Sequence, residues 1–218
     1  MAVRKKTAIP VKVPRGRPPI AEAAQYRERI LDATAAVFLE KGFERASTNE
    51  IALRAQASKQ TIYSLFPTKA ELFVGVMTAC TEQLYAPLTY YIESNQPPRQ
   101  ALTGMGERLL RLFRSPEFLA LYRILVAQVQ TFPKPALALS RGYVERGYGL
   151  LAEYLRSRRI GGPDYHKAAA RFVSFVLGDF VINATLDPGV RMSDRTLHAR
   201  VKEAVDDFFR LYTEPAEK

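Results

Sequence analysis

Polar side chains that could bind another molecule gather between Ser47 and Lys69. Ser58 can cap a short helix, on which Ile62, Leu65 and Phe66 would face inward. The side chains left on the outer face of this helix are those of Lys59, Gln60, Thr61 and Tyr63. Ammonium, amide and hydroxyl groups donate and accept hydrogen bonds, so this face is a candidate binding surface.

Two short helices joined by a tight turn would position this face. Ser47 with Glu50 forms a capping-box pattern, so the first of them should begin there. Gln56-Ala57 leaves room only for a tight turn before the helix capped by Ser58. Two helices of about two turns joined in this way form a helix-turn-helix, whose second helix fits the major groove of DNA.

A further helix should begin just after Pro67, where Thr68 and Glu71 repeat the capping-box pattern. The free N–H groups at its start, together with Lys69, form an anion site suited to a DNA phosphate. Capped short helices also occur in many helical proteins without any such role. The pattern alone therefore leaves DNA binding and a structural role equally open.

The positive charge of the chain is concentrated near its start. The 218 residues carry a formal net charge of +10, of which residues 1–70 hold +7 and residues 71–218 hold +3. Residues 1–20 contain six basic residues, no acidic residue and four prolines, a composition that cannot build a core. We expect an extended, disordered arm there. The charge favours a polyanionic partner bound at one end of the molecule, DNA rather than a membrane.

Other kinds of chemistry have little support in the sequence. Cys80 is the only cysteine and His166 and His198 are the only histidines, so neither a disulfide nor a Cys/His zinc site can be assembled. We find no nucleophile elbow, phosphate loop or metal motif. The most apolar stretch, 172–182, is too short to span a bilayer. We therefore expect no catalytic residue, metal, cofactor or membrane contact, and a cytoplasmic location.

Helical periodicity interrupted by prolines predicts an all-α chain of about nine helices. The first should end at Gly42, and the two short helices of the motif follow it. The later helices are expected over residues 69–94, 99–114, 117–131, 136–159, 165–186 and 194–212. The helix after Lys69 would join a small basic head to a larger helical body.

Residues 30–72 carry a specific set of residue types at fixed spacing. The set is Ile30, Ala36-Val37-Phe38, Gly42-Phe43, Ser47, Ile51-Ala52, Ala55, Ser58, Thr61-Ile62-Tyr63, Phe66, Lys69 and Leu72. It resembles the N-terminal domain of the TetR/AcrR family of bacterial transcriptional regulators. Gln56 departs from the family, which usually has glycine in this turn, and a left-handed conformation there would cost about 1 kcal/mol.

The resemblance implies three segments and a role for each polar residue of the motif. Residues 1–20 would be the basic arm, 21–68 the helix-turn-helix DNA-binding domain, and 69–218 the ligand-binding and dimerisation domain. Lys59, Gln60 and Thr61 should face base edges, since lysine suits guanine and glutamine suits adenine. The phosphate backbone should be held by Tyr63, Lys69 and the Ser47 cap. Ser58, the cap of the second helix, is also a predicted DNA-binding residue. A solvated polar side chain is the alternative for each.

The arm holds a second candidate DNA contact. Residues 14–18, with Arg15 and Arg17, resemble the Arg-Gly-Arg-Pro core of hooks that insert into narrow A·T-rich minor grooves. A basic tail that only raises nonspecific affinity is an equally good interpretation.

By the same resemblance, the helices over 165–186 and 194–212 should pair with their copies across a two-fold axis. The predicted interface residues are Phe172, Val176, Phe180, Val201, Val205, Phe208 and Tyr212. Burial inside one subunit could explain either helix alone. A helix-turn-helix that binds half-sites makes a homodimer the better account of both.

Residues 114–133 are similar to the regulatory domain of the AefR-like subgroup, which implies a ligand pocket between residues 99 and 180. The predicted lining is Met105, Leu109, Phe113, Tyr122, Arg123, Val126, Gln130, Tyr143 and Phe175, which would suit a mostly apolar ligand. Such side chains at helical spacing are more often ordinary core. Arg123 either reaches water or pairs with an anionic ligand group.

These expectations together predict a homodimeric repressor that a small apolar ligand releases from a palindromic operator in double-stranded DNA. Two alternatives stay open: an enzyme, and a regulator or architectural protein that binds DNA without a ligand.

Overall fold

The computed structural model describes residues 20–93 and 95–213, so the predicted arm with Arg15 and Arg17 lies outside the described residues. Within them the chain is all-helical, as predicted. The helices are α1 (Ile20–Arg45), α2 (Thr48–Arg54), α3 (Lys59–Leu65), α4 (Lys69–Glu93), α5 (Pro98–Arg114), α6 (Pro116–Gln128), α7 (Pro133–Leu139), the π-helix η1 (Ser140–Val144), α8 (Glu145–Ser157), α9 (Tyr165–Leu177), α10 (Phe180–Leu186) and α11 (Asp194–Thr213).

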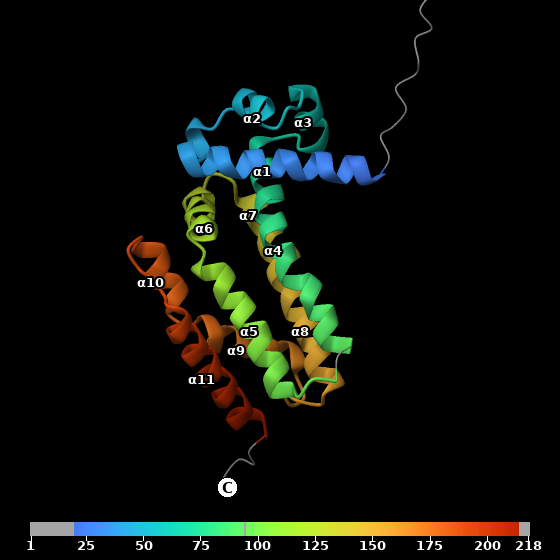
Figure 1. Cartoon of the computed structure of the whole chain (residues 1–218), viewed down its shortest axis with the longest axis vertical. Coiled ribbons are helices and arrows are strands. Elements are labelled where there is room, and N and C mark those ends of the chain that lie inside the picture. The colour runs from blue at the N-terminus through green and yellow to red at the C-terminus, as the bar shows by residue number, and fades with distance from the viewer. Residues whose placement is uncertain (1–19, 94, 214–218) are drawn as a thin grey trace, which may run out of the picture.

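Helices α1, α2 and α3 form the head, which lies across one end of α4 (Figure 1). Its core contains Phe38 of α1, Ile51 of α2 and Ile62 of α3, all fully buried. The regular part of α1 stops at Gly42, whose φ of 74° and ψ of 171° are not helical, so the predicted stop is confirmed. A side chain would strain this left-handed φ, which accounts for glycine there.

Helix α4 runs from the head into the body, which comprises α5 to α11 (Figure 1). Its first turns bury Leu72 and Phe73 in the core of the head. Helices of the body join this same core, since Phe118 of α6 is buried in it and the ring of Phe132 lies 5.3 Å from that of Phe43. Packing therefore continues from the head into α6, and the domain boundary after residue 68 stays a prediction.

A second core lies between α5, α8, α9 and α11. Its largest fully buried side chains include Leu102, Tyr154, Phe172 and Phe208. Burying each such side chain contributes roughly 1.5–3 kcal/mol, so this layer fixes the far end of the body. The body therefore holds its own core at the end away from the head.

Two predicted helices are divided in the structure. The helix expected over 136–159 begins earlier, at Pro133, and consists of α7, the π-turn η1 and α8. The helix expected over 165–186 breaks at Gly178, and α9 and α10 meet at 51°. Gly178 has a φ of 46°, and a Cβ there would overlap Arg200, which caps α9 by donating to the carbonyls of Val176 and Leu177.

Candidate functional site

The two short helices of the head form the predicted helix-turn-helix. Ser58 caps α3 by accepting a hydrogen bond from the N–H of Thr61 at 3.0 Å, as predicted. The turn passes through Gln56, whose φ of 52° is left-handed. The N–H of Ala57 donates to the carbonyl of Ala52 at 2.9 Å and closes the turn. The position that departs from the TetR/AcrR pattern is thus the one in a conformation that favours glycine.

Replacing Gln56 by glycine is therefore expected to stabilise the head by about 1 kcal/mol, because it removes the clash of Cβ in the left-handed conformation. Urea unfolding followed by circular dichroism measures this change. Gln60→Gly, inside α3, is the matched control and should lower stability by a similar amount. A loss of stability in Gln56→Gly would show that its side chain contributes more than its backbone strain costs.

The three predicted base-reading residues on the outer face of α3 differ in their exposure and in their hydrogen bonds. Lys59 and Gln60 are exposed, and within the described residues their side chains make no hydrogen bond or ion pair. Thr61 is only half-exposed, and its hydroxyl lies 2.7 Å from that of Ser58 inside the helix cap. Lys59 and Gln60 are therefore the side chains available to a partner.

Polar groups also meet at the start of α2. Tyr63 of α3 is exposed, and its hydroxyl donates to Thr48 at 3.2 Å. The neighbouring Ser47 caps α2 by accepting from the N–H of Asn49 at 3.2 Å. The side chain of Glu50 does not complete the expected capping box, because it pairs with Lys41 at 2.6 Å.

Lys69 lies at the start of α4, and its ammonium is bonded within the head. The expected capping box at the start of α4 forms in both directions between Thr68 and Glu71. The ammonium of Lys69, however, donates to the carbonyls of Phe43, Glu44 and Ala46 at 2.8, 3.1 and 3.4 Å. It also lies 4.6 Å from the centre of the Phe43 ring. Its donors are therefore engaged in holding the end of α1, and the expected phosphate contact stays a prediction.

An ion pair fixes α2 against α1. Both guanidinium nitrogens of Arg54 donate to the two carboxylate oxygens of Glu40, at 2.6 and 2.8 Å. These hydrogen bonds hold the pKa of the Glu40 carboxyl below its usual value. The pair therefore fixes the orientation of α2, the helix on which α3 packs.

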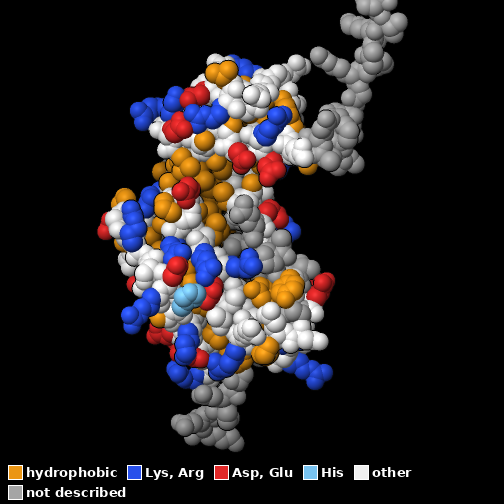
Figure 2. Space-filling model, in the orientation of Figure 1, with side chains coloured by type: hydrophobic (Ala, Val, Ile, Leu, Met, Phe, Trp, Pro, Cys, Tyr) orange, Lys and Arg blue, Asp and Glu red, His pale blue; other side chains and the backbone are white. Residues whose placement is uncertain are grey.

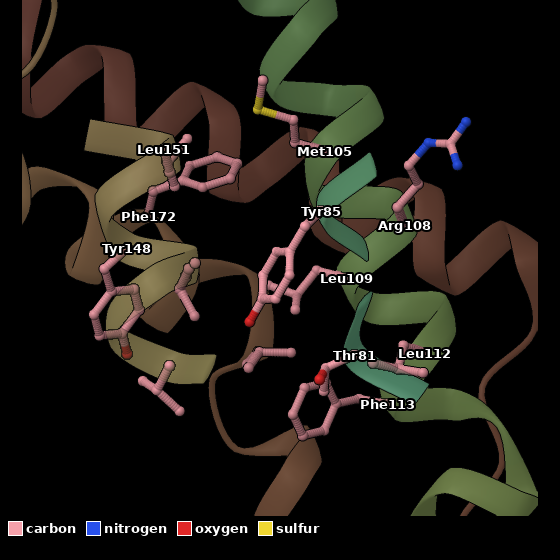
Figure 3. A pocket seen from close by; sticks show the side chains of 14 residues that line it. Thr81, Tyr85, Met105, Arg108, Leu109, Leu112, Phe113, Tyr148, Leu151 and Phe172 are labelled. Atoms are coloured by element: carbon pink, nitrogen blue, oxygen red, sulfur yellow. The ribbon is translucent and has the colours of Figure 1, made fainter. Parts of the chain in front are cut away.

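An apolar cavity of about 210 Å³ lies in the body between α4, α5, α8 and α9 (Figure 3). Of the residues predicted to line a pocket, Met105, Leu109 and Phe113 line this cavity. The sequence reasoning missed its remaining lining residues, which are Thr81, Tyr85, Arg108, Leu112, Val144, Gly147, Tyr148, Leu151, Phe172, Val173 and Leu177. The pocket was expected between residues 99 and 180, which excludes α4, and the sequence carries no signal that distinguishes the other lining residues from core residues.

Five other predicted pocket residues do not line the cavity: Tyr122, Arg123, Val126, Gln130 and Phe175. Tyr122 packs its ring against Phe113 and Phe118. Arg123 donates to the carbonyls of Ala184 and Thr185, so it caps the end of α10 and is not free to anchor a ligand. Val126, Gln130 and Phe175 are exposed. The side chain of Tyr143 lies outside the described part of the structure.

The predicted dimer-interface residues lie mainly inside the subunit. Phe172, Val176, Phe180, Val201, Val205 and Phe208 are all at most 6% exposed and belong to the core of the body. Tyr212 is half-buried and packs against Phe208. These side chains face their own subunit because α9 and α11 pack against each other, which leaves little of their surface for a second copy, and the expected dimer contacts stay a prediction. The exposed apolar residues of α9 and α10 are instead Phe175, Ile182 and Leu186.

Burial raises the pKa of the Cys80 thiol, which makes it a poorer nucleophile at neutral pH. Across residues 20–93 and 95–213, no group of three or more His, Cys, Asp or Glu side chains is placed to hold a metal ion. In the same ranges no single helix is long and apolar enough to cross a membrane, although α9 and α10 pass that test as a bent pair.

Comparison with known proteins places both parts of the chain in one family. Curated relatives match over part of their length: the transcriptional activator FasR and the transcriptional repressor KstR of Mycolicibacterium smegmatis are 32% and 33% identical over 83 and 87 residues. These matches cover 38% and 40% of this chain, and only 38% and 43% of the relatives.

A solved structure of a putative TetR-family regulator from Mesorhizobium loti superposes with a TM-score of 0.77 at 26% identity, covering 87% of this chain and 98% of that one. Residues 30–76 match bacterial regulatory proteins of the tetR family, and residues 100–214 match the C-terminal domain of AefR-like transcriptional repressors. The chain therefore belongs to the TetR family of transcriptional regulators, which are not enzymes.

Proposed function

We propose that this chain is a homodimeric transcriptional repressor that a small, largely apolar ligand releases from its DNA operator. The observation that carries the proposal is the outer face of α3, where Lys59 and Gln60 are exposed without a partner among the described residues. The helix beneath them is fixed by buried Ile62 and the Ser58 cap. The match to an AefR-like repressor domain favours repression over activation.

In the proposed complex α3 lies in the major groove. Lys59 donates to guanine and Gln60 bonds to adenine, because these side chains match the acceptor and donor patterns of those bases. Tyr63, which is bonded to Thr48, and Ser47, which caps α2, contact the phosphate backbone and set the register of α3. Lys69 supports this surface indirectly, by holding the end of α1.

The proposed dimer uses the outer faces of α9 and α10. Ile182 and Leu186 are 63% and 79% exposed, and Phe175 adds a third exposed apolar side chain. Large exposed apolar side chains on adjacent helices are typical of a surface that a partner covers. Sedimentation of the full chain at micromolar concentration is expected to give a dimer, and a monomer there would contradict this part of the proposal.

The proposed release depends on α4, which connects the cavity to the head. Thr81 and Tyr85 of α4 line the cavity, while Lys69 at its start is bonded to the end of α1. A ligand that binds more tightly to a shifted position of α4 changes the spacing of the two α3 helices. Since both must enter successive major grooves about 34 Å apart, that ligand lowers affinity for DNA.

Selection from a pool of random DNA duplexes tests the proposal. The full chain is expected to enrich a palindromic site whose half-sites lie about 10 base pairs apart, or a multiple of that spacing. Failure to enrich any sequence, or enrichment of a single asymmetric site, would contradict DNA reading by a symmetric dimer.

A further inference from the structure

Two cavities lie on either side of one stripe of α5. The apolar cavity is lined by Met105, Leu109 and Phe113 of this helix. A second cavity, of about 560 Å³, is lined by other residues of α5, among them Glu107 and Arg111, and by Cys80 and Tyr91 of α4. Arg108 and Leu112 line both cavities, and because they are four residues apart they lie one above the other on the helix. This pair therefore marks the border between the cavities.

Arg108 differs from the other residues of the apolar cavity. It is the one charged side chain among those that line it. Figure 3 shows its guanidinium directed away from Tyr148 and Phe172, on the opposite side of α5. Within the described ranges this guanidinium makes no hydrogen bond or ion pair, and the side chain is exposed. Arg108 thus lines both cavities, while its guanidinium, which has no protein partner in the described ranges, points away from the apolar one.

The neighbouring carboxylate does not balance this charge. One oxygen of Glu107 lies 3.2 Å from the guanidinium of Arg111, and the other lies 2.6 Å from the imidazole of His198. Glu107 is therefore committed to these two groups rather than to Arg108. Figure 2 shows basic side chains over this part of the body, below a largely hydrophobic area next to the head. The border between the cavities consequently favours a negative group.

The size of the apolar cavity indicates how much of a ligand it can hold. The apolar cavity, at about 210 Å³, is smaller than the roughly 300–1,000 Å³ typical of a ligand site. A ligand of ordinary size would fill it and extend beyond it, and one that crosses the border formed by Arg108 and Leu112 would enter the second cavity. The part inside would be apolar, and the part beyond would meet a guanidinium.

We propose that the effector is an amphipathic anion, whose apolar chain fills the apolar cavity and whose carboxylate or similar head group lies across the border, in the second cavity, where it binds the guanidinium of Arg108. The planar guanidinium can donate two parallel hydrogen bonds to such a head group, which gives orientation as well as affinity. This inference rests on the proposed function, because it names the ligand class for the same cavity.

Calorimetric titration of the full chain with three ten-carbon probes tests the inference at mildly alkaline pH, where a carboxylate is ionised. Decanoate is expected to bind about tenfold more tightly than decan-1-ol, and decyltrimethylammonium more weakly than either. Arg108→Gln should abolish the advantage of decanoate over decan-1-ol, and Arg108→Lys should retain part of it. Leu109→Trp, which fills the cavity, should weaken both probes equally.

Arg195→Gln is the matched control, since Arg195 is an exposed arginine of α11 that lines neither cavity. It should preserve the preference for decanoate, and thermal melting should show that each variant is folded. Equal affinities for decanoate and decan-1-ol in the unmodified chain, or a preference that survives in Arg108→Gln, would overturn the inference.

Binding of the selected DNA duplex in the presence of each probe separates the two proposals. If decan-1-ol binds as tightly as decanoate and both weaken DNA binding, release by a ligand stands but the anionic class is wrong. If decanoate binds through Arg108 and leaves DNA affinity unchanged, the ligand class stands and release is contradicted.

Discussion

Replacing Lys59 and Gln60 together by alanine is expected to lower affinity for the selected operator by about 100-fold or more. Each side chain is exposed on α3 and can make a paired contact to one base, and such a contact contributes about 1–3 kcal/mol of discrimination. The head should stay folded, because neither side chain is buried or bonded within the described residues. Fluorescence anisotropy with a labelled operator duplex measures the loss, and circular dichroism checks the fold.

The matched control for this double variant is Lys167→Ala with Gln100→Ala. Lys167 and Gln100 are exposed on the body, so the control removes the same groups at a distance from the head. It should bind the operator like the unmodified chain. Operator affinity that is unchanged in the α3 variant would show that α3 does not read the bases.

Replacing Lys69 by methionine is expected to destabilise the chain by about 2–3 kcal/mol. The ammonium donates to three carbonyls after the break in α1, and hydrogen bonds to a charged group contribute about 1.5–3 kcal/mol, less where water has access. Methionine keeps much of the stem but leaves those carbonyls without their donor. Urea unfolding of the full chain measures the difference in free energy.

Lys59→Met provides the matched comparison, because it removes the same charge from an exposed position of the same head. Lys59→Met should lose operator affinity with stability unchanged within about 0.5 kcal/mol. Lys69→Met should lose stability while the dependence of DNA binding on salt stays the same under conditions where it is folded. If the slope of log affinity against log salt concentration is smaller by about 1 in Lys69→Met, Lys69 instead contacts a phosphate, as the sequence predicts.

Features set by neighbouring residues could be predicted from the sequence. The stop at Gly42 and the Ser58 cap each depend on one residue type and on groups within three positions of it. The tight turn at Gln56 follows from spacing, because only a short connection fits between the two helices, and its left-handed conformation was expected from the glycine that the TetR/AcrR family usually has there. The all-α class and the helix-turn-helix rest on the same local rules.

Contacts between distant segments could not be predicted in this way. The apolar stripes of α9 and α11 are real, but helical periodicity cannot tell whether a stripe faces its own subunit or a copy. Val176 and Phe208 face inward, which leaves Ile182 and Leu186 outside.

The hydrogen-bond partners of long basic side chains could not be predicted from the sequence either. Lys69 reaches carbonyls 23 to 26 residues away, and Arg123 reaches carbonyls 61 and 62 residues away. In both cases a group assigned to a ligand completes the end of a helix. The sequence carries no signal that distinguishes these two roles, since each requires only a cation at the surface.

The most direct test of the central claim, that α3 reads a specific DNA sequence, compares the dissociation constants of the full chain for the selected duplex and for a shuffled duplex at several salt concentrations. We predict a ratio of about 1,000 or more in favour of the selected duplex, with both affinities falling as salt rises. Equal affinities for the two duplexes at every salt concentration would contradict the account.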